Sequence, residues 1–250
     1  NNYISVLEQV EQSLADRIPG VLITMVTRIT EKNVLINRYW MNSTIKPEIP
    51  VEYLEKIEHV VLGMLSIAYP SVYKELELAI EGEEPSSVFF LEPVFPLPQL
   101  IIAGAGPIGK ALAHIGSMLD FEVTVIDDRH EYANNENIPD ARHIIVSDIG
   151  EAMQGLRKST DTYVVIVTRG HKDDAGALKP CIGSGVAYIG MIGSKTKIAS
   201  MRSDFLENGW TTAKQWDAIY DPIGIDSRSQ SVEEMAGSIA AKLVLVRRMS

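Results

Sequence analysis

The sequence predicts an α/β protein in which a smaller α+β domain is followed by a parallel sheet with helices on both faces. Three observations support this fold class. Short apolar runs alternate with helical patterns in the second half of the chain, which is typical of a doubly wound parallel sheet. A glycine-rich segment, GAGPIG, directly follows the first of these runs. Closely spaced prolines within residues 93–99 separate the two halves, because such prolines interrupt both helices and central strands.

The N-terminal α+β domain is expected to span residues 1–92, with a proline-rich linker over residues 93–99. Two runs rich in β-branched residues, VLITMVTRI and NVLINRYWM, predict an antiparallel pair of strands. A second helix over residues 51–68 and a strand at SVFFLEPV complete the domain. The domain begins with a helix, whose predicted apolar face contains Ile4, Leu7, Val10, Leu14 and Ile18.

The C-terminal domain is expected to span residues 100–250. Consecutive apolar positions indicate strands that are buried on both faces. The final helix is predicted to begin at a capping box formed by Ser231 and Glu234. The predicted strands are the runs QLIIAGAG, FEVTVID, HIIVSD, TYVVIVTRG and VAYIGMIG, with a weaker sixth at AIYDPIG.

The segment LIIAGAGPIGKALA contains two phosphate-binding patterns. Gly104, Gly106 and Gly109 match the G-x-G-x-x-G of dinucleotide-binding folds, while Gly104, Gly109 and Lys110 match most of the P-loop of nucleoside-triphosphate-binding proteins. A P-loop needs serine or threonine after its lysine to ligate magnesium, and Ala111 occupies that position. The dinucleotide pattern therefore fits better, and it predicts a Rossmann-like domain.

The surroundings of this loop support the same conclusion. Pro107 and Ile108 open a helix after the strand, and a helix N-terminus offers free N–H groups to a phosphate. The next strand ends at Asp127, about 20 residues beyond the first glycine, where a carboxylate accepts a hydrogen bond from a ribose hydroxyl of NAD. Asp128 and Arg129 follow, and the arginine leaves NADP open as well. We expect all of these residues to contribute to cofactor binding.

A polar segment, VTRGHKDD, follows the fourth predicted strand of this sheet. Its position is outside the carboxyl end of a strand, where open α/β sheets bind ligands. We expect Thr168 and His171 to line the cofactor site, with His171 and Asp174 as the candidate catalytic residues. The alternative is a polar loop in which one of the aspartates caps the next helix.

A second polar segment stands at the corresponding place one strand later. Gly193 allows close backbone approach, and Ser194 suits the cap of the following helix. Lys195 and Lys197 place positive charge at the start of that helix, where the helix dipole does not favour it. We expect Gly193, Ser194 and Lys195 to face an anion, and the alternative is a solvated helix start.

Charge and composition limit the classes of function. The net charge of −10, without a long basic run, argues against sequence-independent nucleic-acid binding. The single cysteine, Cys181, excludes an intramolecular disulfide, and no histidine pair has metal-ligand spacing, so we expect no structural metal. The acidic N-terminus is unlike a signal peptide, and no apolar run reaches the roughly 18 residues of a membrane span. We expect a cytoplasmic protein that does not bind membranes.

Four segments together resemble the XdhC/CoxI family, accessory proteins of molybdenum hydroxylases such as xanthine dehydrogenase. The resemblance covers nearly everything from Phe89 to the C-terminus. The chain departs from the family at Pro107, where relatives often carry histidine, and it lacks the Gly-Gly-Cys segment usual in the N-terminal domain. The four segments are FFLEPVFPLPQLIIAGAGPIGKALAHIGSMLDFEVTVIDDR, VTRGHKDD, SGVAYIGMIGSKTK and DPIGIDSRSQSVEEMAGSIAAKLV.

The resemblance implies a protein that binds the molybdenum cofactor (molybdopterin), promotes its sulfuration and delivers it to an apo molybdenum hydroxylase. A cysteine desulfurase is a further implied partner. We also expect a homodimer, which the amphipathic first and last helices would support. Two alternatives rest on the glycine loop and Asp127: an NAD(P)-dependent oxidoreductase, and a nucleotide-sensing binding protein.

Overall fold

The computed structural model describes residues 2–30, 32–66, 73–78, 87–226 and 229–249. The chain forms two compact units, Asn1–Pro96 and Leu97–Ser250, and each is described by itself. Among the described residues, no helix is both long enough and apolar enough to cross a bilayer.

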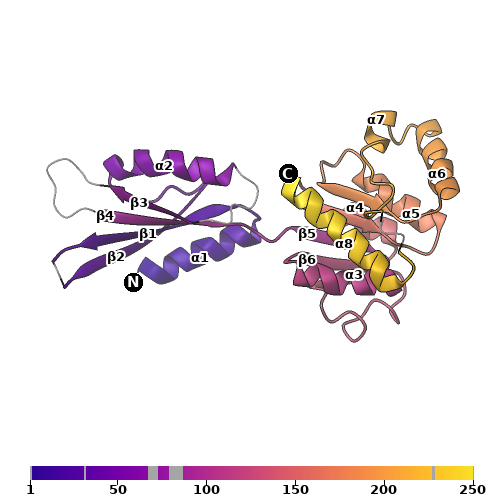
Figure 1. The fold of residues 1–250 in the computed structure, drawn as a ribbon, viewed down its shortest axis with the longest axis horizontal. Coiled ribbons are helices and arrows are strands. Elements are labelled where there is room, and N and C mark those ends of the chain that lie inside the picture. The colour runs from indigo at the N-terminus through magenta and orange to yellow at the C-terminus, as the bar shows by residue number, and fades with distance from the viewer. Residues whose placement is uncertain (1, 31, 67–72, 79–86, 227–228, 250) are drawn as a thin grey trace. The chain divides into compact units, whose positions relative to one another are not determined.

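The first unit is a four-stranded antiparallel sheet with one helix on each face (Figure 1). The strands lie in the order β2-β1-β4-β3, and β1 pairs with both β2 and β4. The predicted antiparallel pair and the predicted strand at SVFFLEPV are therefore present, while the charged strand β3 was not predicted. The elements are α1 (Asn2–Ala15), β1 (Gly20–Arg28), β2 (Val34–Asn42), α2 (Val51–Leu65), β3 (Lys74–Leu78) and β4 (Ser87–Val94).

The core of this unit lies between α2 and the sheet. Side chains alternate between the two faces of a strand, so every second residue of β1 and β4 points toward α2. Ile23 of β1 lies opposite Leu91 of β4, and both are fully buried against Ile57 and Val61 of α2. Helical spacing in this part of the sequence predicts an apolar stripe that includes Ile57 and Val61, and both residues face the sheet.

Helix α1 buries only part of the face that its apolar spacing predicts. Ile4 and Leu7 are 58% and 43% exposed, whereas Val6 and Ser13 are buried. Ser13 is buried because its hydroxyl accepts hydrogen bonds from Trp40 Nε1 at 2.8 Å and from the Asn42 side-chain amide at 2.9 Å. Two buried donors on β2 thus set the rotation of the helix.

Strand β4 extends through Val94, into the segment that the sequence assigns to a linker. Pro93 lies opposite Val21 of β1. On its other side β4 pairs with β3 only as far as Leu91, so Pro93 is at an edge, where its missing N–H costs no ladder hydrogen bond.

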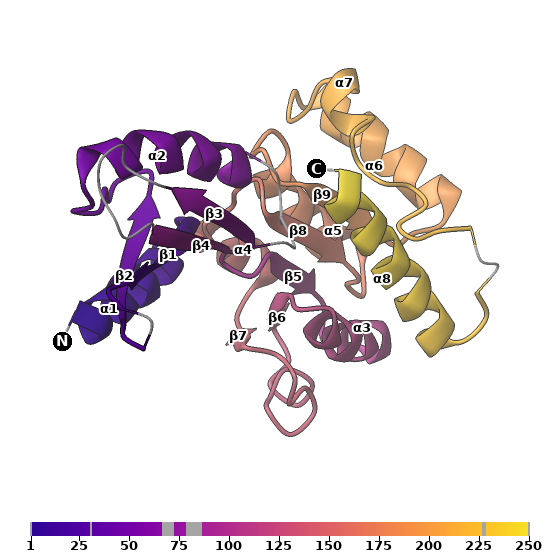
Figure 2. The same cartoon turned by 60° about the vertical axis from the view of Figure 1, so that its left-hand side comes forward.

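The second unit is a five-stranded parallel sheet in the order β7-β6-β5-β8-β9 (Figure 2). The five predicted strands all form, but the predicted sixth is reduced to a single bridge between Gly190 and Tyr220. The elements are β5 (Gln99–Ala103), α3 (Pro107–Met118), β6 (Glu122–Asp127), β7 (His143–Val146), α4 (Ile149–Gly155), β8 (Thr162–Ile166), α5 (His171–Leu178), the 3-10 helix η1 (Lys179–Cys181), β9 (Tyr188–Met191), α6 (Lys195–Glu207), α7 (Ala213–Trp216) and α8 (Val232–Met249).

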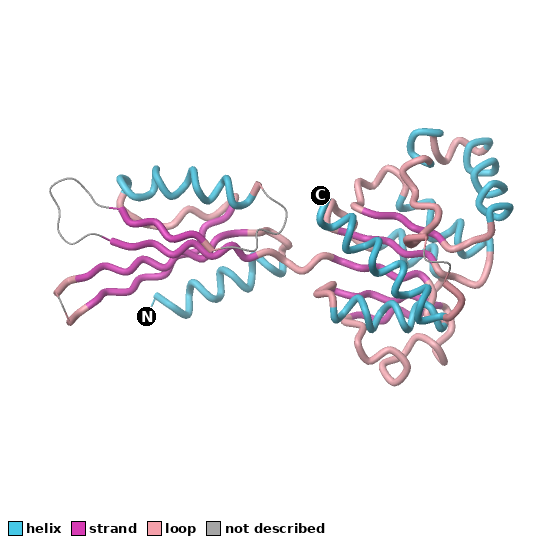
Figure 3. Tube along the Cα trace, in the orientation of Figure 1, coloured by secondary structure: helices cyan, strands magenta, loops and turns pink. Residues whose placement is uncertain are grey.

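Helices cover both faces of this sheet (Figure 3). On one face, Leu112 of α3 and Leu243 of α8 are buried against the strands. On the other, Met153 of α4, Leu178 of α5 and Met201 of α6 are buried. The predicted capping box of α8 is present, since Ser231 accepts from the Glu234 N–H and the Glu234 carboxylate accepts from the Ser231 N–H. This is the Rossmann-like doubly wound arrangement that the sequence predicts.

Candidate functional site

The glycine loop lies at the carboxyl end of β5, the strand at which the sheet order reverses. Strand β5 pairs with β6 on one side and β8 on the other, so the connections leave it toward opposite faces. Ligands of open α/β sheets bind at such a switch point. Gly104 has a φ of +117°, and a Cβ there would lie 2.5 Å from the Val167 carbonyl oxygen. Glycine is therefore required by the backbone itself.

The other two glycines of the loop differ in what they leave room for. A Cβ on Gly109 would lie 1.9 Å from the Gly104 carbonyl oxygen, so its glycine lets α3 pack closely on the loop. A Cβ on Gly106 would have no atom of the chain within 4 Å, and the φ of −68° suits any residue. Space beside Gly106 is thus open to an approaching ligand.

The start of α3 presents backbone donors next to this space. Pro107 is the first residue of the helix, and Gly106 at the N-cap provides no side-chain cap. The N–H groups of Ile108 and Gly109 have no acceptor within the helix, because the first turn lacks preceding carbonyls. Together with the helix dipole, these groups favour an anion. A hollow of about 510 Å³ lies along α3, lined in part by Pro107, Lys110 and Glu233, and its lining does not include Ile108 or Gly109.

Asp127 ends β6 and faces the glycine loop, where it is only 2% exposed. Its Oδ2 accepts from the Ala105 N–H at 2.8 Å and from Arg129 Nη2 at 2.9 Å. Its Oδ1 accepts from the N–H of Arg129 at 3.0 Å and from Arg129 Nε at 2.8 Å. Burial by itself raises the pKa of Asp127, but these hydrogen bonds outweigh it and lower the pKa to about 2. The carboxylate therefore stays ionised.

Asp128 and Arg169 connect the two strands that flank β5. Arg169 Nη2 donates to both carboxylate oxygens of Asp128, at 2.7 and 2.8 Å. Because Asp128 follows β6 and Arg169 follows β8, the pair spans the carboxyl end of the sheet at the loop. Both side chains are about half exposed, so the pair is open to exchange with a charged ligand.

Thr168 and Asp174 belong to a buried polar cluster behind the loop. The Thr168 hydroxyl donates to Asp174 Oδ1 at 2.6 Å. The Asp174 side chain is fully buried, and its Oδ2 forms an ion pair with the ammonium of Lys197 on α6. Asp174 thus joins the end of β8 to α6 and does not face solvent.

The two candidate catalytic residues have separate partners. His171 begins α5 and lies 3.4 Å from Asp204 on α6 through its Nε2 atom, whereas Asp174 contacts Thr168 and Lys197. His171 is therefore placed on the α5–α6 surface. The structure does not join the two side chains into an acid–base pair.

Residues 193–195 stand at the start of α6, and all three are exposed. Ser194 caps the helix by accepting from the Lys197 N–H at 3.2 Å. The charge pattern at this helix start pointed to both Lys195 and Lys197, and Lys197 is the lysine that reaches the buried cluster. Lys197 stands three residues after the cap, and its ammonium pairs with Asp174 of α5.

Cys181 in η1 is fully buried, and its thiol donates to the Ala177 carbonyl oxygen at 3.2 Å. Burial raises the pKa of this thiol to about 12. It therefore remains a protonated thiol at neutral pH and is not a candidate thiolate ligand.

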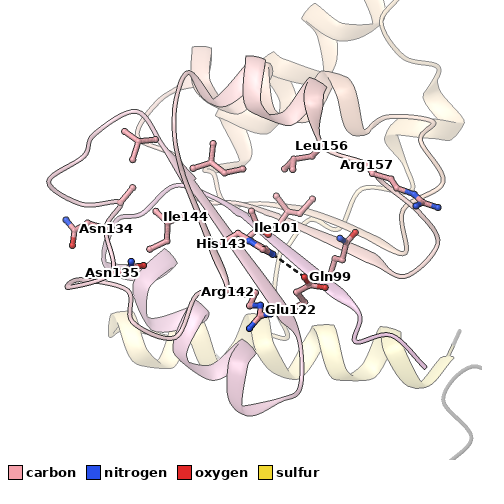
Figure 4. A pocket seen from close by; sticks show the side chains of 14 residues that line it. Gln99, Ile101, Glu122, Asn134, Asn135, Arg142, His143, Ile144, Leu156 and Arg157 are labelled. Carbon is pink, nitrogen blue, oxygen red and sulfur yellow. Dashed lines mark hydrogen bonds and ion pairs between the residues drawn. The ribbon is translucent and has the colours of Figure 1, made fainter. Parts of the chain in front are cut away.

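A second hollow, of about 810 Å³, runs along the edge strand β7 from Arg142 to Val146 (Figure 4). Its lining also includes the first residues of β5 and β6, Gln99 and Glu122, together with Arg157. The residues of the glycine loop are not part of this lining.

Comparison with known proteins identifies the family of the second unit. Residues 100–243 match the model of the XdhC Rossmann domain, and this range contains every candidate site residue named above. The chain belongs to the XdhC family. The resemblance inferred from the sequence is therefore confirmed, and the Rossmann-like fold of the second unit is that of the XdhC family.

Two named bacterial proteins are similar to this XdhC-family chain. It is 26% identical to the Escherichia coli (strain K12) protein named uncharacterized protein YqeB over 151 residues, 60% of this chain and 27% of that protein. It is 25% identical to a Bacillus subtilis (strain 168) protein, named as one of the probable subunits of xanthine dehydrogenase, over 159 residues, 64% of this chain and 46% of that protein. The chain thus matches less than half the length of either relative.

One solved structure shares the fold of most of the chain. The crystal structure of a xanthine dehydrogenase from Bacillus halodurans has a TM-score of 0.66 and 24% sequence identity. The match covers 97% of this chain and 64% of that chain. At this identity the similarity establishes the fold.

Proposed function

We propose that the protein is an accessory protein of a molybdenum hydroxylase of the xanthine dehydrogenase type, and that its second unit binds the molybdenum cofactor as cargo. The observation that carries this proposal is the match of residues 100–243 to the XdhC Rossmann domain, which includes the entire glycine-loop site. The names of the Bacillus subtilis relative and the Bacillus halodurans structure, which both mention xanthine dehydrogenase, support it.

The geometry of the loop fits the phosphate of the cofactor. The pterin carries a phosphate, and the start of α3 offers N–H groups without helical acceptors beside the open space at Gly106. Lys110, on the outer face of the same helix turn, is exposed and adds positive charge nearby. We assign phosphate binding to Gly104, Gly106, Pro107, Ile108 and Gly109.

The described residues of the second unit supply no thiolate for the metal. Cys181 is the only cysteine of the sequence, and its burial and raised pKa keep it protonated. We therefore propose that the second unit holds the cofactor through its phosphate. Arg169, Asp128, His171 and Lys195 at the carboxyl end of the sheet are the further proposed contacts.

The wider role follows from handling this cargo. We propose that the protein presents the cofactor for sulfuration, with a cysteine desulfurase as the partner, and then to the apo-hydroxylase. A homodimer remains a prediction.

The test is a calorimetric titration of the full chain with purified molybdenum cofactor under anaerobic conditions. We expect saturable binding at tens of micromolar or tighter, of the order of −6 kcal/mol or more favourable. Gly106→Ala should weaken binding, because the added methyl enters the space that the phosphate would use. Gly155→Ala is the matched control, since a Cβ there also meets no atom within 4 Å but lies in α4. Absence of binding, or equal binding by both variants, would overturn the proposal.

The alternatives are an NAD(P)-dependent oxidoreductase and a nucleotide-sensing protein. Both rest on the G-x-G-x-x-G loop with Asp127 after β6. NADH binding with turnover of a small carbonyl compound would favour the first, and NAD binding without turnover would favour the second.

A further inference from the structure

We infer that Arg129 closes the position at which a dinucleotide-binding fold receives a ribose, so that the site takes a phosphorylated ligand that places no sugar diol on Asp127. The inference rests on the proposed function, because it specifies which class of phosphorylated ligand the same loop accepts. It makes Arg129 a residue that determines specificity.

Donors of the chain itself occupy the Asp127 carboxylate. A carboxylate offers about four lone-pair positions to hydrogen-bond donors. Asp127 accepts four hydrogen bonds, three from Arg129 and one from the N–H of Ala105. A ribose hydroxyl would therefore have to displace one of these donors.

A ribose hydroxyl would compete with the Arg129 guanidinium, which is a strong donor to Asp127. Arg129 meets Asp127 in a bidentate, charge-assisted arrangement, which is stronger than a hydrogen bond from a neutral hydroxyl. Both side chains are shielded, with 3% of Asp127 and 20% of Arg129 exposed. Displacing the guanidinium would leave it poorly solvated and without its partner, so the exchange is unfavourable.

In dinucleotide-binding folds, an arginine near this position can bind the 2′-phosphate of NADP. Here the guanidinium is held on its edge by Asp127 and on its face by Tyr132, whose ring centroid lies 4.0 Å from the guanidinium carbon. Arg129 is therefore fixed beside the glycine loop and is not a mobile arm for a 2′-phosphate.

Asp127 has a structural role toward the glycine loop. Its Oδ2 accepts from the N–H of Ala105, the residue between the first two glycines of the loop. Asp127 thus fixes the loop, and Arg129 fixes Asp127. The phosphate-binding backbone is preorganised by the carboxylate that a dinucleotide-binding protein would use for the ribose.

The experiment titrates the full chain with NADH by fluorescence and, in parallel, with the molybdenum cofactor by calorimetry. We expect wild-type protein to show no saturation by NADH up to about 1 mM. Arg129→Ala frees the acceptor positions of Asp127, and we expect it to bind NADH at least about tenfold more tightly than wild type. The double variant Arg129→Ala/Asp127→Asn should lose that gain.

Two results would overturn the inference. One is wild-type binding of NADH in the micromolar range that Asp127→Asn abolishes, and the other is an Arg129→Ala variant that folds but binds NADH no more tightly. Circular dichroism reports folding. If Arg129→Ala does not fold, Arg129→Lys replaces it, because an ammonium cannot fill both carboxylate oxygens as a guanidinium fork does. Its expected gain is smaller and in the same direction, and an absent gain would count against the inference.

The two titrations separate this inference from the proposed function. Loss of molybdenum-cofactor binding with no NADH binding would remove the proposed function and leave the exclusion of ribose intact. Binding of both ligands, with NADH dependent on Asp127, would contradict the exclusion alone.

Discussion

Arg129 holds Asp127 by two parallel hydrogen bonds, Nε to Oδ1 at 2.8 Å and Nη2 to Oδ2 at 2.9 Å. The same carboxylate accepts from the backbone of the glycine loop at Ala105. The loop is consequently fixed to the end of β6 by the protein's own side chains. The shape of the loop is therefore supported by contacts within the chain.

This pair predicts a dependence of stability on pH. The pKa of Asp127 is lowered from 3.8 to about 2 in the folded protein. A carboxylate whose pKa is lowered by folding stabilises the fold above its unfolded pKa, and the contribution is lost as the pH falls through the folded pKa. We expect a loss of about 2–3 kcal/mol between roughly pH 5 and pH 2. Urea unfolding at a series of pH values measures it.

The matched variants for this prediction are Asp127→Asn and Asp128→Asn. Asp127→Asn should be less stable at pH 7 and should lose this part of the pH dependence. Asp128→Asn should keep it, because that carboxylate is about half exposed. Identical pH profiles for wild type and Asp127→Asn would contradict the assignment.

The glycine loop predicts a large effect on stability at one glycine and a small effect at another. Gly109→Ala would place a Cβ 1.9 Å from the Gly104 carbonyl oxygen, so backbone must move and the second unit should lose several kcal/mol of stability. Gly106→Ala should change stability by less than about 1 kcal/mol, because nothing lies within 4 Å of its Cβ. Thermal unfolding compares them. Equal destabilisation would show that the loop is packed differently.

The buried ion pair between Asp174 and Lys197 predicts a structural role for both side chains. Asp174→Ala removes the partner of Lys197 and the acceptor of the Thr168 hydroxyl, and we expect a loss of about 3–5 kcal/mol in the free energy of unfolding. Asp173→Asn is the control. The Asp173 carboxylate is partly exposed, and its ion pair with Arg169 is long at 4.0 Å. If Asp174→Ala unfolds no more easily than the control, Asp174 has no structural role.

Cys181 predicts a thiol that is inert in the folded protein. Burial keeps a thiol reagent from reaching Cys181, and the pKa of about 12 keeps the thiol protonated. Ellman's reagent at pH 8 should leave the native protein unlabelled over the time in which denatured protein reacts completely. Rapid labelling of the native protein would contradict this assignment.

Much of the second unit was predictable because its signals are local. Strands buried on both faces produce consecutive apolar runs, and the capping box at Ser231 and Glu234 is a short-range pattern that the structure contains. The glycine loop was predictable for the same reason, since Gly104 and Gly109 are fixed by contacts within a few residues or with the adjacent strand.

Two features depended on contacts that spacing does not reveal. The apolar stripe of α1 placed Ile4 and Leu7 inward, but the polar Ser13 is buried because Trp40 and Asn42 of β2 donate to it. At the site, the position of Asp127 after β6 was predictable, whereas its saturation by Arg129 was not. An aspartate and an arginine two residues apart in sequence can form an ion pair, as Asp127 and Arg129 do, or leave the carboxylate free.

The identity of the ligand that copurifies with the full chain tests the central claim most directly. Mass spectrometry and metal analysis of wild-type protein and of Gly106→Ala, each purified anaerobically, provide the measurement. We predict a phosphorylated pterin with molybdenum in the wild-type protein and its depletion in Gly106→Ala. A nicotinamide dinucleotide in the wild-type protein, with no molybdenum, would contradict the account.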